Sequence, residues 1–360
     1  MFSFDQEGIS LFTADRARGE ARERETSVGG RPPRARRGLR GATDRAMSWG
    51  MRTVSDERST GVIARKSEED AARARRRTTL VVFGFVGIGA ALGWAWLAAM
   101  IGAMLATSDM SALGPGMGLF NRLNGLATFS PEVRAGLAVL CAPVTTSWSV
   151  GDWASVAAMW VAMVAAMMLP TALPVFRAYG DLGAERIAAG ERVVSPVALG
   201  LGYLTVWLVF AVLATAAQGA LTAARLVTPA GLPASLVLAG TTMIAAGLYQ
   251  FSPLKGACLA RCRAPRPFFA DNWSARVGGV YRMGLAQGLD CMGCCWALMV
   301  VMFAVGVMNV VWIAVLGAVM TVEKLSPSAW ISRVIGVVLI VWGAALIAGS
   351  PIGAAITAKF

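Results

Sequence analysis

Long apolar runs that recur after about residue 78 are the feature that most restricts how this chain can fold. Several of them approach or exceed the roughly 20 residues that an α-helix needs to cross a lipid bilayer. The chain is 56% hydrophobic, and only 15% of its residues carry a charge. The sequence therefore predicts an all-α protein, a polytopic transmembrane helical bundle of about six or seven spans.

The composition of residues 1–78 differs from that of the rest. They hold just over half of the Lys and Arg residues and most of the acidic residues, and they lack an apolar period. We expect a disordered, Arg-rich cytoplasmic tail here, and a translation start at Met47 or Met51 is an alternative. A transmembrane helical domain over 79–350 and a short C-terminal tail over 351–360 are expected to follow.

The basic residues around the apolar runs predict the topology. ARARRR (72–77) lies directly before the first run, and the positive-inside rule keeps it in the cytoplasm. We therefore expect a multi-pass protein of the cytoplasmic (inner) membrane with a cytoplasmic N-terminus. The predicted helices are 79–106, 152–176, 196–224, 233–251, 284–305, 309–322 and 328–349.

Charged connections separate some of these helices. Segments 177–194 and 252–282 are expected to be cytoplasmic loops. Pro170 and Pro174 are expected to kink helix 152–176. The sixth helix is short for a span, so a six-span topology is an alternative.

Some functional classes are excluded by what the sequence lacks. The chain contains no histidine, which removes the commonest neutral metal ligand and the usual general base near neutral pH. There is no P-loop and no phosphorylation-site aspartate motif, so we expect neither an ATPase nor another enzyme. A nucleic-acid partner is not expected, because acidic residues are interspersed among the basic ones and aromatics are few in the tail.

Sulfur-containing side chains form a stripe on the predicted helix 284–305. In CMGCCWALMVVM (291–302) they fall on one face at 100° per residue, with thiols at the inner end and thioethers further out. Helix 152–176 repeats the pattern at every fourth residue. The candidate metal ligands are Cys291, Cys294, Cys295, Met299, Met302, Met159, Met163 and Met167.

Soft donors of this kind favour one ion. Thiolate and thioether are soft ligands, and Cu(I) is the soft biological cation that accepts both. Core filling is the alternative for a methionine stripe, and redox chemistry or packing is the alternative for a CxxC pair. The whole pattern C-x2-CC-x3-M-x2-M beside other Met-rich helices favours copper, Cu(I), as the bound metal.

Three further residues are candidates for entry or accessory roles. Cys258 and Cys262 lie in a basic stretch, where nearby Arg and Lys favour the thiolate form. They are a possible metal entry site, with ordinary loop cysteines as the alternative. Asp290 either neutralises a bound cation or accepts a thiol proton, or else it lies at the inner interface near Arg282 and water.

Several segments resemble the bacterial predicted metal-binding integral membrane protein family, a domain of unknown function. They are WVAMVAAMMLPTALPVF (160–176), GLYQFSPLKGACLARCRAP (247–265), GLAQGLDCMGCCWALMVVMFAVGVMN (284–309) and EKLSP (323–327). Some members of that family are described as copper chaperones that serve tyrosinase-type polyphenol oxidases. The resemblance covers about residues 80–350. It implies metal binding through Cys291, Cys294, Cys295, Met299 and the methionines of helix 152–176.

One part of the sequence departs from the family pattern. A histidine usually occupies the position of Gln287, and an aromatic residue often occupies that of Asp290. Gln287 cannot act as an imidazole ligand. Three interpretations are open: sulfur alone binds the metal, Asp290 compensates, or the site has decayed. The first fits Cu(I) best.

Together these features predict a Cu(I) chaperone or relay in the lipid bilayer that hands copper to an extracytoplasmic copper enzyme or removes it from the cell. Cys291, Cys294 and Cys295 would form the main site. A membrane thiol-disulfide redox protein is one alternative, and it leaves the methionine stripes unexplained. A structural or assembly subunit with no metal role is the other.

Overall fold

The structure is a computed structural model that describes residues 48–105, 109–123, 148–229, 231–328 and 330–351. These residues form helices and connecting turns, and the only β-type pairing among them is one isolated bridge between Val227 and Pro233. The all-α prediction is confirmed for this part of the chain. The chain divides into two units, Met1–Gly61 and Val62–Phe360, and the bundle described below belongs to the second.

The first helix, α2 (Ser48–Leu105), begins earlier than the predicted residue 79. Residues 48–78 are helical, whereas the sequence analysis expected an irregular tail. Arg, Ala and Glu together make up much of this stretch and are good helix formers even without an apolar period. Residues 1–47 lie outside the described residues. Only the portion Ala72–Met104 is long and apolar enough to span a bilayer.

Five helices in the described part of the chain meet the length and hydropathy expected of a membrane span. This pattern indicates a membrane protein. Two shorter helices, α7 (Leu236–Tyr249) and α12 (Val310–Leu325), occupy the positions of two further predicted spans. The five long segments are Ala72–Met104 of α2, α4 (Val150–Thr171), α6 (Pro196–Ala223), Val277–Val305 and α13 (Trp330–Ala348).

Pro170 and Pro174 do more than kink the predicted helix 152–176. The helix ends at Thr171, and α5 (Leu173–Ala188) begins two residues later. The charged segment that was expected to be a loop is therefore helical as far as Ala188. Its Ala, Glu and Arg residues favour a helix, and apolar residues such as Leu182 give it a buried face.

The basic stretch 252–282 is also not a loop. It forms α8 (Pro253–Arg263) and α9 (Pro265–Asp271), and it includes the first turn of α10 (Val277–Val300). The short helix α11 (Met302–Val305) follows α10 directly. Each of α8 and α9 starts at a proline, which is well suited to the first turn of a helix. Because α8 packs against α10 and α12, its cysteines lie in the interior of the bundle.

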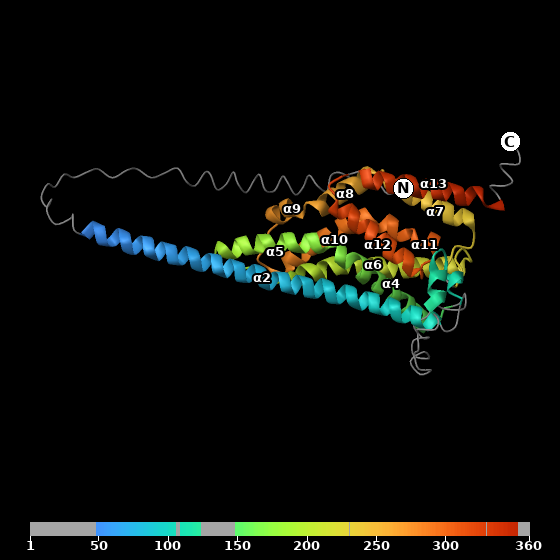
Figure 1. Cartoon of the computed structure of the whole chain (residues 1–360), viewed down its shortest axis with the longest axis horizontal. Coiled ribbons are helices and arrows are strands. Elements are labelled where there is room, and N and C mark those ends of the chain that lie inside the picture. Colours follow the sequence, from blue (N-terminus) through green and yellow to red (C-terminus); the bar gives the residue numbers. More distant parts are fainter. Residues whose placement is uncertain (1–47, 106–108, 124–147, 230, 329, 352–360) are drawn as a thin grey trace. The chain divides into compact units, whose positions relative to one another are not determined.

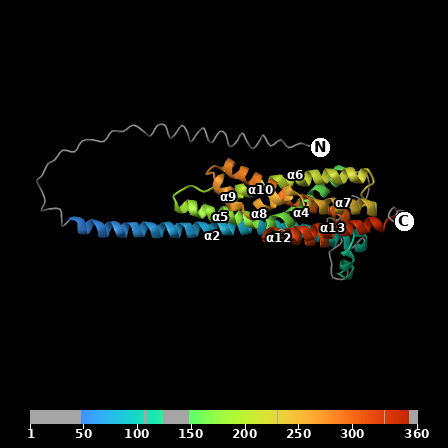
Figure 2. The same ribbon diagram turned by 90° about the horizontal axis from the view of Figure 1, so that it is seen from above.

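Helix α10 occupies the centre of the bundle, in contact with α6, α7, α8 and α12 (Figures 1 and 2). Glycines allow the closest of these contacts. A Cβ atom at Gly202 would overlap the carbonyl oxygen of Tyr281, and one at Gly284 would overlap that of Leu199. Helices α6 and α10 therefore approach backbone to backbone, and α4 packs against α6 and α12.

Candidate metal centre

Three thiol groups from two helices adjoin one another in the interior. The Sγ atom of Cys294 on α10 lies 3.3 Å from Sγ of Cys295 and 3.9 Å from Sγ of Cys262 on α8. All three residues are buried. Two sulfur ligands that each bind one metal at about 2.3 Å cannot lie more than about 4.6 Å apart. Each of the two pairs, Cys294 with Cys295 and Cys294 with Cys262, is therefore close enough to share an ion.

Cys291 adjoins the thiols of Cys294 and Cys295 and has two further partners. Its Sγ atom lies 2.9 Å from Nζ of Lys324 on α12 and 2.9 Å from the hydroxyl oxygen of Tyr203 on α6. Lys324 also donates to Oγ1 of Thr171, and Tyr203 donates to the carbonyl oxygen of Met168. Cys291 is thus fixed where α4, α6, α10 and α12 meet.

Lys324 and Tyr203 were not selected from the sequence. Lys324 lies just beyond the predicted helix 309–322, yet its side chain is buried. A buried lysine is costly unless it is paired. A signal was present in the sequence, because EKLSP belongs to the segments that carry the family resemblance. Nothing in the linear pattern identifies Cys291 as the partner, since 33 residues separate the two.

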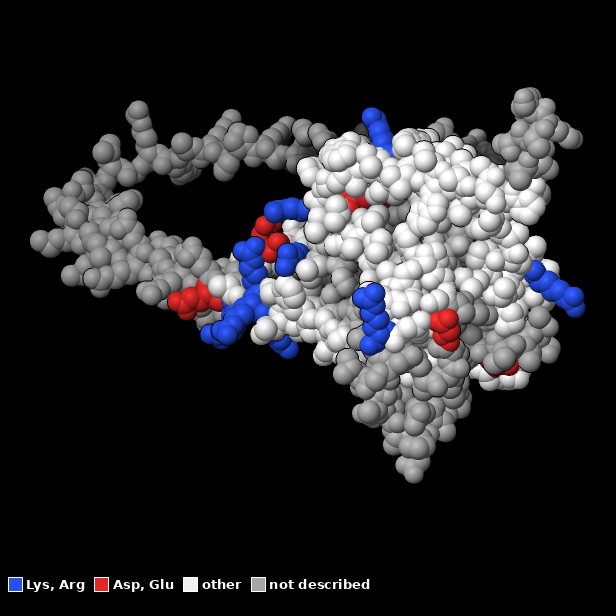
Figure 3. Space-filling model, turned by 45° about the vertical axis from the view of Figure 1, so that its right-hand side comes forward, with Lys and Arg blue, Asp and Glu red and all other residues white. Residues whose placement is uncertain are grey.

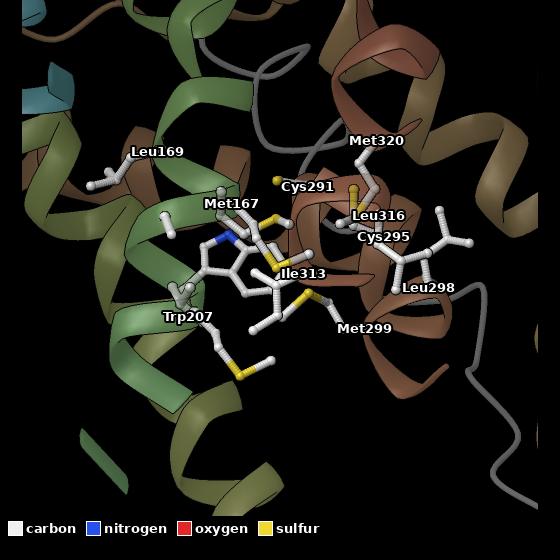
Figure 4. Packing of buried hydrophobic residues seen from close by; sticks show 14 of the residues in the cluster. Met167, Leu169, Trp207, Cys291, Cys295, Leu298, Met299, Ile313, Leu316 and Met320 are labelled. Carbon is white, nitrogen blue, oxygen red and sulfur yellow. The ribbon is translucent and has the colours of Figure 1, made fainter. Parts of the chain in front are cut away.

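The candidate methionines are all buried. Met163, Met299 and Met302 have no exposed surface, and Met159 and Met167 are only 1% and 2% exposed. Figure 4 shows Met167 from α4, Met299 from α10 and Met320 from α12 in one interior lined by Trp207. Met320 was not among the predicted ligands. It joins this interior because α12 packs against both α4 and α10.

Asp290 has a partner that the sequence analysis did not name. Its Oδ1 atom lies 2.7 Å from Nε of Arg261, whereas Arg282 was expected nearby. Nη2 of the same arginine lies 3.7 Å from Sγ of Cys258. The ion pair joins α8 to α10 on the side of the thiol group, so Asp290 contributes to holding Cys262 beside Cys294.

The basic neighbour of Cys258 acts in the predicted direction, but burial outweighs it. Burial raises the pKa of the Cys258 thiol, and the opposing effect of Arg261 is smaller. The thiol is buried because a glycine allows close packing on α10: a Cβ atom at Gly293 would lie 2.6 Å from its sulfur. Cys258 is therefore a packed thiol beside the group formed by Cys262, Cys294 and Cys295.

Comparison with protein families identifies the class to which this interior belongs. Residues 157–346, more than half of the chain, match the family PpoB2, described as a copper chaperone. The chain belongs to this copper chaperone family. The match includes every candidate ligand named above and bears out the resemblance stated from the sequence. The family description names a chaperone, which is not a class of enzyme. Neither the curated proteins nor the solved structures give a match.

Gln287 is the position at which this chain departs from the family pattern, because a histidine usually occupies it. It lies one helical turn before Cys291, is completely buried, and neither of its amide atoms has a hydrogen-bond partner among the described residues. A buried amide without a partner destabilises a protein by about 1–3 kcal/mol. The copper chaperone thus carries an unsatisfied polar group directly beside its cysteines.

Within the described ranges, no group of three or more Cys, Asp or Glu residues is arranged so that it could hold a metal ion. The buried methionine thioethers are additional possible ligands beyond these residue types. Cys294 adjoins the thiols of Cys262 and Cys295, while the Cys291 thiol beside them also contacts the ammonium group of Lys324. A copper site in this interior would therefore have few thiol ligands, or would be completed by methionine.

Proposed function

We propose that this membrane protein binds Cu(I) between Cys294 and one neighbouring thiol, that of Cys295 or Cys262, and passes it outward along methionine thioethers to an extracytoplasmic copper enzyme. Copper is the cargo in this account, and the protein keeps no resident cofactor. The proposal goes beyond the family description in three respects: the oxidation state, the ligands and the direction.

The observation that carries the proposal is the position of α8. It brings Cys262 to within 3.9 Å of Cys294, which in turn lies 3.3 Å from Cys295. The chain has no histidine, so sulfur is the main donor available in this apolar interior. Soft thiolate and thioether ligands select Cu(I) over harder divalent ions. Zinc is less suitable, because structural zinc sites use four Cys or His ligands.

Lys324 gives Cys291 a separate role. An ammonium group and Cu(I) are both cations, so they compete for the same sulfur atom and repel each other. We assign Cys291 to a transfer position, at which arriving copper displaces Lys324 toward its second partner, Thr171. The copper would rest on Cys294 and one of its neighbouring thiols, Cys262 or Cys295, and would pass Cys291 only in transit.

The methionines supply the outward part of the path. Met299 and Met302 follow the thiols along α10 and α11, and Met159, Met163 and Met167 line α4. A thioether adds no buried anion and needs no proton loss, whereas a cysteine binds as a thiolate. The ion is therefore held more weakly with distance from the cysteines, which favours release at that end.

The orientation in the membrane is part of the same proposal. Arg261, Arg263 and Arg266 lie on α8 and α9, at the end of the bundle that contains the thiols. The positive-inside rule places such a basic end in the cytoplasm. Copper would then enter beside α8 and leave on the extracytoplasmic side.

Release from proteoliposomes tests the direction. Protein loaded with Cu(I) is mixed with a membrane-impermeant Cu(I) chelator, either added outside or trapped inside. We expect Met163→Leu and Met167→Leu to slow release to the extracytoplasmic chelator while Cu(I) stays bound. Met243→Leu, a buried change on α7 outside the proposed path, is the matched control. Equal rates in all three variants would rule out the methionine path.

A thiol-disulfide function is the second candidate, and one observation favours it. Cys262 and Cys294 need to approach by about 2 Å to reach the S–S bond length of a disulfide. Such a function requires no metal and makes no use of the methionines. Redox turnover in copper-free protein that carries the Met163→Leu and Met167→Leu changes would support this candidate over the copper relay.

A further inference from the structure

A cavity of about 480 Å³ lies where the charged part of α2 meets its apolar span. The size falls in the range of small-molecule sites. One wall is α2 and the other is the end of α5 with the connection to α6. The lining residues include Arg73, Arg77 and Val81 on α2, and Ile187, Val194 and Ser195 opposite.

Two guanidinium groups in this cavity have no partner among the residues that the structure describes. Arg73 and Arg77 are one helical turn apart on α2, so their side chains leave the same face. Both are exposed, and neither forms an ion pair or a side-chain hydrogen bond among the described residues. Their neighbour Arg75 differs, because it pairs with Asp181 at 2.7 Å. Figure 3 shows that, on the side of the molecule in view, Lys and Arg gather mainly at one end of the bundle.

The opposite wall is apolar and fixed. Ile187 and Val194 line it, and the Tyr179 hydroxyl donates to the carbonyl oxygen of Val194 at 2.8 Å. Helix α6 begins at the same place, with Ser195 as its N-cap. The positive end of the α6 dipole therefore adds to the attraction of the two arginines for an anion. One turn further along α2, Val81 continues the apolar lining toward the span.

We infer that this cavity binds the headgroup of an anionic phospholipid, with its phosphate on Arg73 and Arg77 and its first chain carbons along Val81 and Val194. The occupant must carry a negative charge at one end and an apolar part at the other. Basic pockets at the edge of transmembrane helices have this preference. A free phosphate would use the arginines but would leave the apolar wall exposed to water.

Lipid binding to the full-length protein tests the inference. The protein is delipidated in neutral detergent and titrated with phosphatidylglycerol or phosphatidylcholine, and bound lipid is counted by native mass spectrometry. We expect one tightly bound phosphatidylglycerol. The double variant Arg73→Gln/Arg77→Gln is expected to weaken it by about 30-fold, from about 1 kcal/mol for each arginine. Arg73→Lys/Arg77→Lys should keep most of the binding, because the charge remains.

A matched control separates this site from general charge attraction. Arg122→Gln/Arg225→Gln removes the same charge from exposed positions, and Arg225 lies beyond the far end of α6. It should leave phosphatidylglycerol binding unchanged. Equal losses in the two Gln double variants would overturn the inference. So would equal affinity for phosphatidylcholine, or full competition by inorganic phosphate at the lipid's own concentration. The inference does not depend on the proposed copper site, whose affinity should be the same in all of these variants.

Discussion

The thiol sulfurs of Cys262 and Cys294 lie 3.9 Å apart, although 32 residues separate them in the sequence. The contact exists because α8 folds back onto α10 and is held there by the ion pair between Arg261 and Asp290. Cys262, which the sequence placed in a loop, is therefore a neighbour of the CxxCC segment in the structure.

The contact predicts a specific cross-link. Treatment of metal-free protein with diamide, which takes up the two electrons and two protons, should join Cys262 to Cys294 in a disulfide. Peptide mass spectrometry would identify the linked pair. Prior loading with Cu(I) should prevent the reaction, because the sulfurs are then metal ligands. A dominant link through Cys258 would contradict the arrangement of α8 on α10.

Cys258 should show a pH dependence of its own. Burial raises the pKa of its thiol, so less of it is thiolate at a given pH than in an unstructured peptide. Alkylation by iodoacetamide at pH 8 should therefore be slower than in a peptide with the same local sequence, and should rise only at higher pH. Mass-spectrometric rates at several pH values test this. A rate equal to that of the peptide would contradict the burial.

Removing the charge of only one member of the buried pair Lys255 and Glu323 should destabilise the folded protein. Nζ of Lys255 lies 2.9 Å from Oε2 of Glu323, and both side chains are almost completely buried. Lys255→Met should lower the free energy of unfolding in detergent by about 3–5 kcal/mol, because a buried carboxylate loses its partner.

A double variant is the control for that effect. Lys255→Met/Glu323→Gln removes both charges and should recover a substantial part of the lost stability. Denaturant titrations followed by circular dichroism would measure the double variant and both single variants, Lys255→Met and Glu323→Gln. If the double variant is as unstable as the sum of its two single changes, the two side chains do not act as a pair.

Gln287 and Gln250 should respond to the same substitution in opposite directions. Gln287 has no hydrogen-bond partner among the described residues, so Gln287→Met should raise stability by about 1–2 kcal/mol. Gln250 donates to the carbonyl oxygen of Ala246 and accepts from Lys255, so Gln250→Met should lower stability. Thermal melts in the same detergent test both. A loss of stability in Gln287→Met would show that its amide has a bound partner.

Much of the bundle could be predicted from local patterns. Apolar runs gave the spanning helices, because a bilayer requires about 20 apolar residues in a row. Helical periodicity predicted that Cys291, Cys295 and Met299 lie on one face of a helix, and all three are buried. Pro170 and Pro174 marked the place where the chain bends, although a kink was predicted and the structure has a break between α4 and α5. These features depend on short-range geometry that the linear sequence carries.

The features that were missed depend on tertiary contacts. Helix α8 is short and basic, so hydropathy marked it as a loop, and only its packing on α10 and α12 buries its cysteines. Lys324 contacts Cys291 from a different helix, and the periodicity of a single helix cannot predict a contact between two helices. The start of α2 was misplaced because its first turns are polar, and apolar patterning cannot detect a polar helix.

Anaerobic Cu(I) titration against a chromogenic chelator tests the central claim most directly. The parent protein is compared with Cys262→Ser/Cys294→Ser/Cys295→Ser and with Cys258→Ser as the control from the same helix. We predict stoichiometric Cu(I) in the parent and in the control. The triple variant should fall by more than about 100-fold in affinity, since even the loss of outer contacts costs 10–100-fold. Equal Cu(I) binding by the parent and the triple variant would contradict the account.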